Sequence, residues 1–331
     1  MSQPSTHVIA IGNAIVDVMA PCSDSLIEQL GLVRGGMTLV DTARAQELYD
    51  AMGPAREISG GSAANTLAGL AALGSKCAFI GQVASDQLGE VFAHDIRAGG
   101  ISFATPARAD EPPTARCLIF VTPDGQRTMN TFLGASQYLP AAALDEAAIA
   151  DAEILYLEGY LWDPEEPRAA MRRAISAARN AGRKVAFTLS DAFVIARHGD
   201  DFRALIAAGE IDILFANHVE LAALTGQEDF HAGIDQLKDK VPLLVVTRSE
   251  HGAVAACGGE LFDVPAEPVA KVVDTTGAGD LFAAGFLHAH VHGRSVTECL
   301  TLGAVCAAEI ISHYGARPEA DLRELAARRL G

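Results

Sequence analysis

A strand, a helix and a second strand are predicted in ILYLEGYLWDPEEPRAAMRRAISAARNAGRKVAFTLS (154–190), and this succession decides the fold class. The runs ILYLEGY (154–160) and KVAFTLS (184–190) are short and apolar, which is typical of buried strands. Between them, EEPRAAMRRAISAARNAG (165–182) has apolar residues at helical spacing and ends in glycine, the usual C-terminal stop of a helix. Two strands joined by a helix indicate a parallel pair with the helix packed on the sheet.

The same alternation extends in both directions from this stretch. Further apolar runs predict strands in HVIAIG (7–12), CAFIGQV (77–83), IDILFAN (211–217) and PLLVVTR (242–248). Helical spacing recurs in SAANTLAGLAALG (62–74) and SVTECLTLGAVCAAEIISHYG (295–315). The chain is therefore predicted to form an α/β domain whose mostly parallel central sheet is covered on both faces, with ligands at the carboxyl ends of the strands.

Two stretches break this alternation. Residues 14–44 carry GGMTLVD, and residues 101–135 contain TARCLIFVT and QRTMNTF on either side of the turn signal PDG, which predicts a β-hairpin. We interpret the two stretches as one small β-structured lid. The main domain is then expected to comprise residues 1–13, 45–100 and 136–331.

Composition narrows the class of protein and its location. The 331 residues carry a formal net charge of −17, which argues against nucleic acid or an anionic membrane as a partner because both attract basic surfaces. No apolar run reaches the roughly 18 residues that span a bilayer, and the opening MSQPST lacks the regions of a signal peptide. The six cysteines are scattered singly and are interpreted as small buried hydrophobes. We therefore expect a cytoplasmic protein.

The most informative chemical signal is KVVDTTGAGDLFAAGF (271–286), a strand end followed by a glycine-rich turn and a helix that opens at about Gly279. The backbone of Gly277, Ala278 and Gly279 is predicted to bind a phosphate or an oxyanion, because a helix N-terminus carries partial positive charge. Asp280 would repel a resting anion there, but it suits a general base that takes a proton from a hydroxyl during phosphoryl transfer. Taken alone, it could equally be a first-turn aspartate that favours the helix dipole. The turn lacks the third glycine of a dinucleotide site, and no Walker A loop is present.

The motif DTTGAGD (274–280) resembles the second signature of the PfkB, or ribokinase-like, carbohydrate and nucleoside kinases. Further landmarks of that family occur in the same order over nearly the whole chain. The resemblance implies a ribokinase-like three-layer α/β/α fold with a small β lid. It also implies an ATP-dependent kinase that uses Mg²⁺, with Asp280 as its general base.

Two motifs in the first half of the chain correspond to the substrate side of the family. GNAIVD (12–17) ends in Asp17, whose counterpart binds sugar hydroxyls, and SGGSAANT (59–66) resembles the first signature, in which Asn65 binds the sugar. Taken alone, Asp17 is a polar loop residue and the serines of the second motif cap a helix. The resemblance implies a substrate site made of Asn13, Asp17, Gly60, Gly61 and Asn65.

The nucleotide side is implied by motifs in the second half. NHVE (217–220) resembles a motif whose Asn217 and Glu220 organise magnesium and the phosphates, mainly through water, although His218 stands where the family often has an acidic residue. HYGARPE (313–319) resembles the loop that flanks the adenine of ATP. VTRSEHG (246–252) implies ATP contacts from Thr247, Arg248 and Gly252, with a solvated turn as the alternative.

Two further assignments concern charge around the transferred group. Arg127 of QRTMN is expected to fold over the site and contribute positive charge to the phosphoryl group, with a surface arginine as the alternative. The resemblance also implies a monovalent cation, K⁺, held by backbone oxygens near Asp274, Thr276 and the loop HYGARPE (313–319).

Within the family, the sequence resembles adenosine kinases most, which implies a nucleoside whose 5′-hydroxyl is presented to Asp280. Asp191, after FTLS, departs from the family pattern and could bind a hydroxyl instead, so a free sugar or another purine nucleoside remains open as substrate. A non-catalytic binding module and an NAD-dependent oxidoreductase are the alternatives from other classes. The partner is a small molecule, and both a monomer and a homodimer remain open. Candidates for a slot that holds the base are Met129, Phe132, Leu133 and Phe193.

Overall fold

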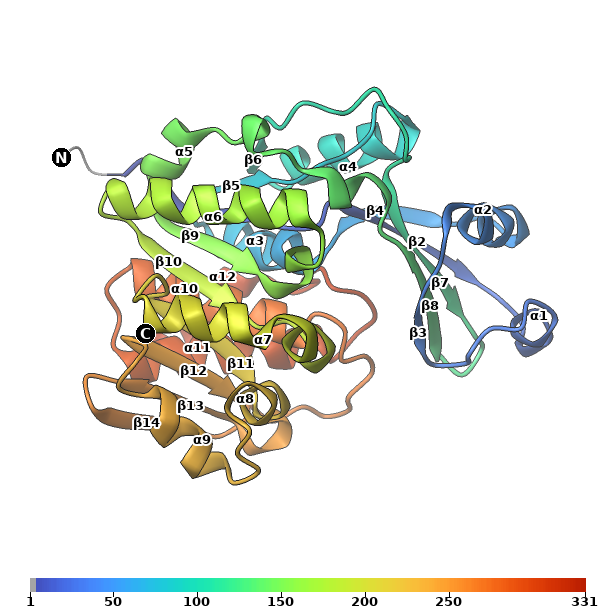
Figure 1. Ribbon diagram of the computed structural model, residues 1–331. Helices are drawn as coiled ribbons and strands as arrows, with labels where there is room; N and C mark the ends of the chain where they lie inside the picture. Colours follow the sequence, from blue (N-terminus) through green and yellow to red (C-terminus); the bar gives the residue numbers. More distant parts are fainter. Residues whose placement is uncertain (1–3) are drawn as a thin grey trace.

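A computed structural model gives the structure of residues 4–331 (Figure 1). Residues 1–3, which begin the segment in which we expect no signal peptide, lie outside the described residues. The strands of the large sheet are β1 (Thr6–Ile11), β5 (Cys77–Ile80), β6 (Ile101–Phe103), β9 (Ala152–Glu158), β10 (Lys184–Thr188), β11 (Ile213–Asn217), β12 (Leu243–Thr247), β13 (Ala253–Cys257) and β14 (Glu260–Val264). Within the described residues, their order is β14-β13-β12-β11-β10-β9-β1-β5-β6.

All six strands predicted from apolar runs are confirmed, and they pair with one another in parallel, as expected of a mostly parallel sheet. Burial on both faces explains why their sequences are continuously apolar. The antiparallel hairpin of β13 and β14 is not predicted, because AVAAC in β13 is rich in alanine, a poor strand former. Gly258 and Gly259 join these strands with φ values of 59° and 82°, as a two-residue turn of this kind requires.

Helices cover both faces of the large sheet, which makes three layers (Figure 1). One face packs against α5 (Glu146–Ala150), α6 (Glu165–Asn180), α7 (Ala192–Ala207), α8 (His218–Thr225) and α9 (Phe230–Leu237). The other packs against α3 (Ser62–Leu73), α4 (Gln87–Ala98), α10 (Ala278–Val291), α11 (Val296–Ile310) and α12 (Leu322–Leu330). The helices predicted at 62–74, 165–182 and 295–315 are thereby confirmed as α3, α6 and α11.

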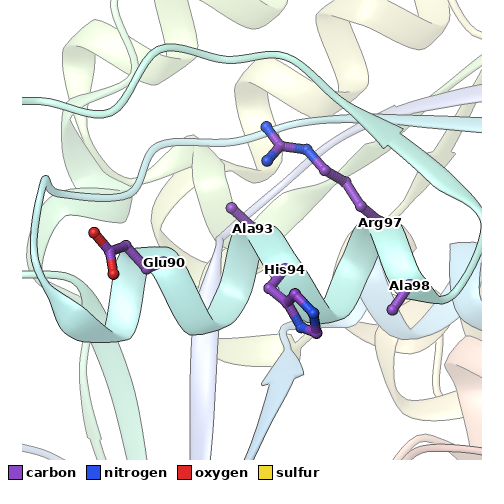
Figure 2. A pocket seen from close by; sticks show the side chains of 5 residues that line it. All are labelled: Glu90, Ala93, His94, Arg97 and Ala98. Carbon is purple, nitrogen blue, oxygen red and sulfur yellow. The ribbon is translucent and has the colours of Figure 1, made fainter.

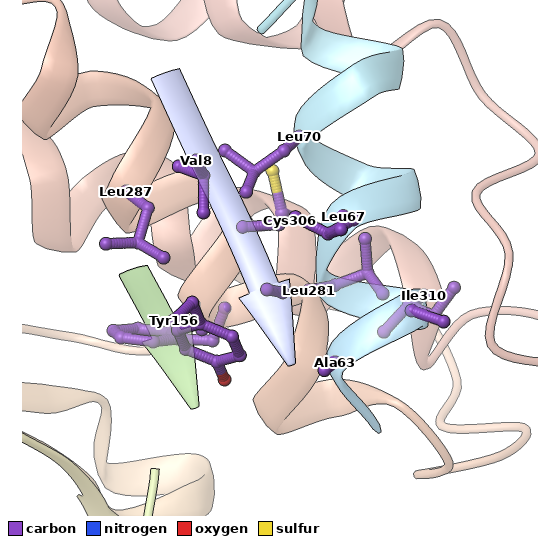
Figure 3. Packing of buried hydrophobic residues seen from close by; sticks show 14 of the residues in the cluster. Val8, Ala63, Leu67, Leu70, Tyr156, Leu281, Leu287, Cys306 and Ile310 are labelled. Atoms are coloured by element: carbon purple, nitrogen blue, oxygen red, sulfur yellow. The ribbon is translucent and has the colours of Figure 1, made fainter. Parts of the chain in front are cut away.

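Helices α3 and α10 approach each other closely at Gly69. A Cβ atom at that position would lie 2.6 Å from Leu281 Cδ1 and 2.7 Å from Ala284 Cβ, so only glycine fits. Figure 3 shows Leu67 and Leu70 of α3 beside Leu281 of α10 in the same apolar cluster. This contact fixes the separation of the two helices whose N-terminal turns carry the motifs singled out above.

A second, smaller sheet extends from the main body (Figure 1). It consists of β2 (Ile15–Pro21), β3 (Met37–Leu39), β4 (Arg56–Gly60), β7 (Ala115–Val121) and β8 (Arg127–Phe132), in the order β3-β8-β7-β2-β4. Helices α1 (Asp24–Gln29) and α2 (Thr42–Ala51) contribute Ile27 and Leu48 to the cluster that buries Val18 and Leu118 of this sheet. The predicted hairpin is confirmed, since β7 and β8 pair antiparallel.

The boundaries expected for the small sheet need correction. The sequence analysis assigns residues 45–100 to the main domain, but β4 lies in the small sheet because it pairs with β2 in antiparallel register. Residues 101–135 are assigned to the lid, but β6 continues the large sheet because it pairs with β5. The small sheet therefore draws on segments that alternate along the chain with those of the large sheet.

Burial of the cysteines follows the expectation for four of the six. Cys77, Cys117, Cys299 and Cys306 are buried, which raises the pKa of each thiol, whereas Cys22 and Cys257 are partly buried. Along residues 4–331, no helix combines the length and the apolar character needed to cross a membrane.

Replacing Gly69 by alanine should destabilise the protein, because the added methyl group must push α3 away from α10. We expect G69A to lower the free energy of unfolding by about 1–3 kcal/mol, measured by urea denaturation with the fluorescence of Trp162, the single tryptophan. The matched control is G199A in α7, where the new Cβ meets mainly the flexible end of Arg203 at 3.2 Å. That variant should be neutral or more stable, and equal losses in both would contradict the packing argument.

Candidate active site

Asp280 lies in the first turn of α10, which begins at Ala278, one residue from the predicted start. Its carboxylate is turned toward α3, where it accepts hydrogen bonds from Ser62 Oγ at 2.6 Å and Asn65 Nδ2 at 3.1 Å. Burial raises the pKa of Asp280, while these two hydrogen bonds and the charge of Arg317 lower it. Among the described residues, α10 has no side-chain cap, and the carboxylate of Asp280 bonds to α3 instead of to its own helix start.

The turn before Asp280 has the geometry of an anion cradle. Gly277 has a φ of 79°, in the left-handed region that favours glycine, and a Cβ there would lie 2.9 Å from Ala316 Cβ. Gly279 is exposed, and a Cβ placed on it would have no atom within 4 Å. First-turn N–H groups have no intrahelical partner, so those of the two glycines can donate to an oxyanion, whereas Ala278 N already donates to Thr275 O at 3.2 Å.

Asp17 of β2 lies against Gly60 of β4, since a Cβ at position 60 would be 2.6 Å from Asp17 Oδ2. Burial raises the pKa of Asp17 to about 6; Arg317 and Arg127 act to lower it, and Asp280 acts to raise it. The predicted hydroxyl-binding carboxylate and the predicted base therefore lie close enough to influence each other. Gly61, with a φ of 97°, starts α3 beside them.

Asn65 and Asn13 differ in what they offer to a ligand. Asn65 Oδ1 is buried without a hydrogen-bond partner among the described residues, so it can accept from a hydroxyl. Asn13, by contrast, donates through Nδ2 to Glu158 at 2.8 Å and accepts from Ser136 Oγ at 2.9 Å. The side chain of Asn13 is therefore engaged within the protein.

Glu158, at the end of β9, is absent from the sequence-based site. It is fully buried and accepts from Asn13 N at 2.7 Å, Asn13 Nδ2 at 2.8 Å and Ala63 N at 2.8 Å. Burial raises its pKa to about 7, against the effect of these donors. By holding Ala63, Glu158 fixes the start of α3, next to Ser62. The signal that could have revealed it is a lone acidic residue inside the apolar run ILYLEGY.

Arg127 is not a free cation over the site. Arg127 Nη1 lies 2.7 Å from Asp274 Oδ2, both side chains are at least nine-tenths buried, and its guanidinium stacks over the ring of Tyr314. Asp274 Oδ2 also accepts from Gly315 N at 3.1 Å, and Asp274 Oδ1 accepts from Thr276 N and Oγ1. The ion pair ties the small sheet to the turn that contains the anion cradle.

The side chains of Asp274 and Thr276 are engaged within the protein, so the expected K⁺, for which backbone oxygens are the implied ligands, stays a prediction. Both oxygens of Asp274 are already occupied by donors, and the hydroxyl of Thr276 donates to Asp274. A cation bound by the carboxylate of Asp274 would have to share it with Arg127.

Asn217 and Glu220 form a reciprocal cap at the start of α8. Asn217 Nδ2 donates to Glu220 Oε1 at 2.7 Å, Asn217 N donates to Glu220 Oε2 at 3.0 Å, and Glu220 N donates to Asn217 Oδ1 at 2.8 Å. Burial raises the pKa of Glu220 to about 7. Each carboxylate oxygen still has a lone pair available, and oxygen ligands suit Mg²⁺, so the residue fits an outer-shell role. His218 is exposed.

The fold and the arrangement around Asp280 agree with the comparison to known families. The model of the pfkB family carbohydrate kinases matches residues 31–322. This chain belongs to the pfkB family. Members of that family transfer a phosphoryl group to a hydroxyl, and they use ATP and generally Mg²⁺.

Solved structures of pfkB relatives match almost the whole chain. A protein from Rhizobium etli CFN 42 described as a probable sugar kinase is 44% identical with a TM-score of 0.90, and adenosine kinase from Sinorhizobium meliloti is 47% identical with a TM-score of 0.89. Each match covers 98% of this chain and 99% of the other. The ATP-dependent ribose-1-phosphate kinase of Halopiger xanaduensis is 32% identical over 288 residues, which are 85% of this chain and 92% of that protein. The ribokinase-like fold is thereby confirmed, and the chain is a nucleoside or sugar kinase of the pfkB family.

The residues of VTRSEHG that are expected to contact ATP lie at and after the end of β12. Thr247 ends β12, and Arg248 pairs with Asp263 at 2.7 Å instead of projecting freely. Gly252 has a φ of 81°, and a Cβ there would meet Val264 O at 2.0 Å, which makes this glycine a requirement of the neighbouring strand. Asp191 caps α7 by accepting from Phe193 N at 2.7 Å.

One surface pocket is unrelated to these motifs. Figure 2 shows that it lies along α4 and is lined by Glu90, Ala93, His94, Arg97 and Ala98. A second groove lies between residues 267–270 and helices α11 and α12. Neither contains a residue of the constellation around Asp280.

The buried ion pair of Arg127 and Asp274 should show strong coupling. We expect R127M and D274N each to lower the free energy of unfolding by about 3–5 kcal/mol, because each leaves one buried charge without a partner. The double variant should lose clearly less than the sum, as measured in a chemical-denaturation double-mutant cycle. Arg173, whose pair with Glu146 is largely exposed, is the control, and R173M should cost less than about 1 kcal/mol. Additive losses at Arg127 and Asp274 would contradict the coupling.

Proposed function

We propose that the chain phosphorylates the 5′-hydroxyl of a nucleoside, adenosine in the first place, and produces AMP from ATP. Asp280 is the general base, and the backbone of residues 277–279 is the anion cradle. The identity of 47% to the Sinorhizobium meliloti adenosine kinase supports this substrate. The relatives described as sugar and ribose-1-phosphate kinases make a free sugar the alternative that an experiment must separate.

The observation that carries the nucleoside assignment is the face of the small sheet that bears Asp17. The strand register gives one row across this face, made of Met19, Ile119, Met129 and Met37. The adjacent row on the same face is made of Asp17, Cys117, Thr131 and Leu39. Met37 and Leu39, on the edge strand β3, are 55% and 61% exposed, whereas Ile119 in the centre of the first row is 2% exposed, so the accessible apolar part of this face lies at its outer edge. An accessible apolar surface beside a hydroxyl-binding carboxylate suits a base attached to a ribose, whereas a free sugar has no comparable apolar part.

This face revises the candidates for the base slot. Met129 belongs to the apolar row, whereas Phe132, three residues on in β8, points to the opposite face and is only 6% exposed. Phe193 is 76% exposed on α7, outside the small sheet. We therefore assign the base to the methionine row, with Met37 and Leu39 at its outer edge.

The proposed reaction uses these groups in turn. Ribose hydroxyls bind Asp17 and Asn65 Oδ1, which leaves the 5′-hydroxyl beside Asp280. Asp280 takes the hydroxyl proton as the 5′-oxygen bonds to the γ-phosphorus, and the bond to the bridging oxygen breaks so that ADP leaves with the electron pair. The open N–H groups at the start of α10 stabilise charge on the transferred phosphoryl group. Mg²⁺, when bound, offsets the charge of the ATP phosphates, and Glu220 would hold it through water.

Removing the base should nearly abolish turnover while binding survives. We expect D280N to lower kcat by about 10²–10⁴-fold, with little change in adenosine affinity measured by calorimetry, since Asn keeps the shape of the side chain. The control is D229N, an exposed cap of α9, which should keep wild-type kcat. Retained turnover in D280N would remove Asp280 as the base.

A panel of nucleosides and free sugars, assayed by ADP release, tests the substrate class. We expect adenosine to give the highest kcat/KM, and the variants M37Q and M129Q to raise KM for adenosine about tenfold because each makes the base surface polar. KM for ATP should stay unchanged in both. The control is L261Q, since Leu261 is also exposed, at 51%, but lies on β14. Faster turnover of ribose or fructose than of any nucleoside would contradict the assignment.

A further inference from the structure

Arg317 makes an unusual set of contacts in the loop that follows α11. Its Nη1 donates to Ala64 O at 3.1 Å, and its Nη2 donates to Ser59 Oγ at 2.9 Å and to Ser59 O. These acceptors flank Gly60, which touches Asp17, and Ser62, which donates to Asp280. The guanidinium therefore fixes the segment that lies between the two carboxylates of the site.

Among the residues that the structure describes, Arg317 forms no close ion pair. In the part of the chain that the structure describes, its hydrogen bonds all go to neutral oxygens. Arg127, the arginine expected to supply charge, is instead bound to Asp274 at 2.7 Å. Burial lowers the pKa of Arg317, and the nearby carboxylates of Asp17, Asp95 and Asp280 act in the opposite direction without outweighing it.

We propose that Arg317 is a positioning residue that holds the segment 59–65 in place and supplies the positive charge that keeps Asp17 and Asp280 ionised together. This inference rests on the proposed function, because it matters for catalysis only if Asp280 is the base. Asp17 and Asp280 are partly buried, and a negative charge on one disfavours ionisation of the other, so a nearby positive charge helps both to stay ionised. A base must be ionised before it can accept a proton, so the compensating cation sets the lower pH limit of the reaction.

The surroundings of the two carboxylates leave this role to Arg317. Burial raises the pKa of both Asp17 and Asp280, and Arg317 lowers both, whereas Arg127 acts on Asp17 while paired to Asp274. The other titratable groups near the pair are Glu158, Tyr156 and Tyr160 of the β9 end, Cys117 of β7 and Asp95 of α4. None of these adds positive charge, since carboxyl, phenol and thiol groups are neutral or negative.

The test is the pH dependence of kcat/KM for ADP release in R317M and R317K. We expect the acid limb of R317M to move up by about one pH unit or more, because an opposite charge nearby lowers a carboxyl pKa by that amount. R317K keeps the positive charge but not the forked geometry of the guanidinium. The acid limb of its pH profile should therefore stay near that of the wild type, while the maximum value of kcat/KM falls. The control is R323M, since Arg323 is an exposed cation on α12 that donates to Ala72 O at 3.2 Å. R323M should keep both the acid limb and the maximum kcat/KM of the wild type.

A lower maximum kcat/KM in R317M with an unmoved acid limb would overturn the proposal, because it would mean that Arg317 only supports the structure. If R317M does not fold, the variant D95N provides a second test, in which the acid limb of kcat/KM is expected to shift in the opposite direction. Asp95 accepts hydrogen bonds from Ser59 N and Oγ, and its negative charge lies near Arg317 and offsets part of the positive charge there. Its neutral replacement should therefore move the limb to lower pH, and an unmoved limb would again contradict the proposal.

A second readout separates this inference from the proposed function. Carboxyl-carbon NMR titration of Asp17 and Asp280, assigned with D17N and D280N, measures both pKa values without any turnover. Both should be higher in R317M than in the wild type, and equal values would overturn the charge role even in an active enzyme. If no nucleoside or sugar in the panel is phosphorylated, the proposed function fails, while the titration still decides the role of Arg317.

Discussion

The hydrogen bonds from Ser62 and Asn65 to Asp280 join two helices that are far apart in the sequence, and the geometry of the candidate site depends on them. They form because α3 and α10 approach closely at Gly69, where no side chain fits. Glu158 then fixes the start of α3 through Ala63 N, and Arg317 fixes the preceding segment. A helix contact in the core thus sets the direction in which the carboxylate points.

The predictable part of the fold is local. Strands buried on both faces give continuous apolar runs, so β1, β9 and β10 are evident in the sequence. The alanine-rich β13 is not, because its burial comes from helices that pack on it and not from its own propensity. Likewise, residues 56–60 pair with β2 although the sequence around them favours the main domain. Strand pairing depends on contacts that no local window contains.

The same limit applies to the site. The turn before Asp280 can be recognised from the sequence because its glycines and the start of the helix are adjacent in the chain. The partners of Arg127 and Asp280 are not, since Ser62 and Asp280 are 218 positions apart. The roles of Glu158 and Arg317 are not evident in the sequence, because Glu158 accepts from backbone N–H groups and Arg317 donates to backbone carbonyls of distant segments. Residue types allow a chemistry to be predicted for this site. The charges that surround Asp17 and Asp280, in contrast, are evident only in the folded chain.

The ion pair between Arg127 and Asp274 links the position of the small sheet to the electrostatics of the anion cradle. Asp274 precedes the cradle by a few residues, and in the docked arrangement its charge is neutralised by an arginine that β8 carries. Movement of the small sheet away from the main body would withdraw that cation and expose the carboxylate at once. The position of the small sheet and the net charge beside the cradle are therefore coupled through this one ion pair.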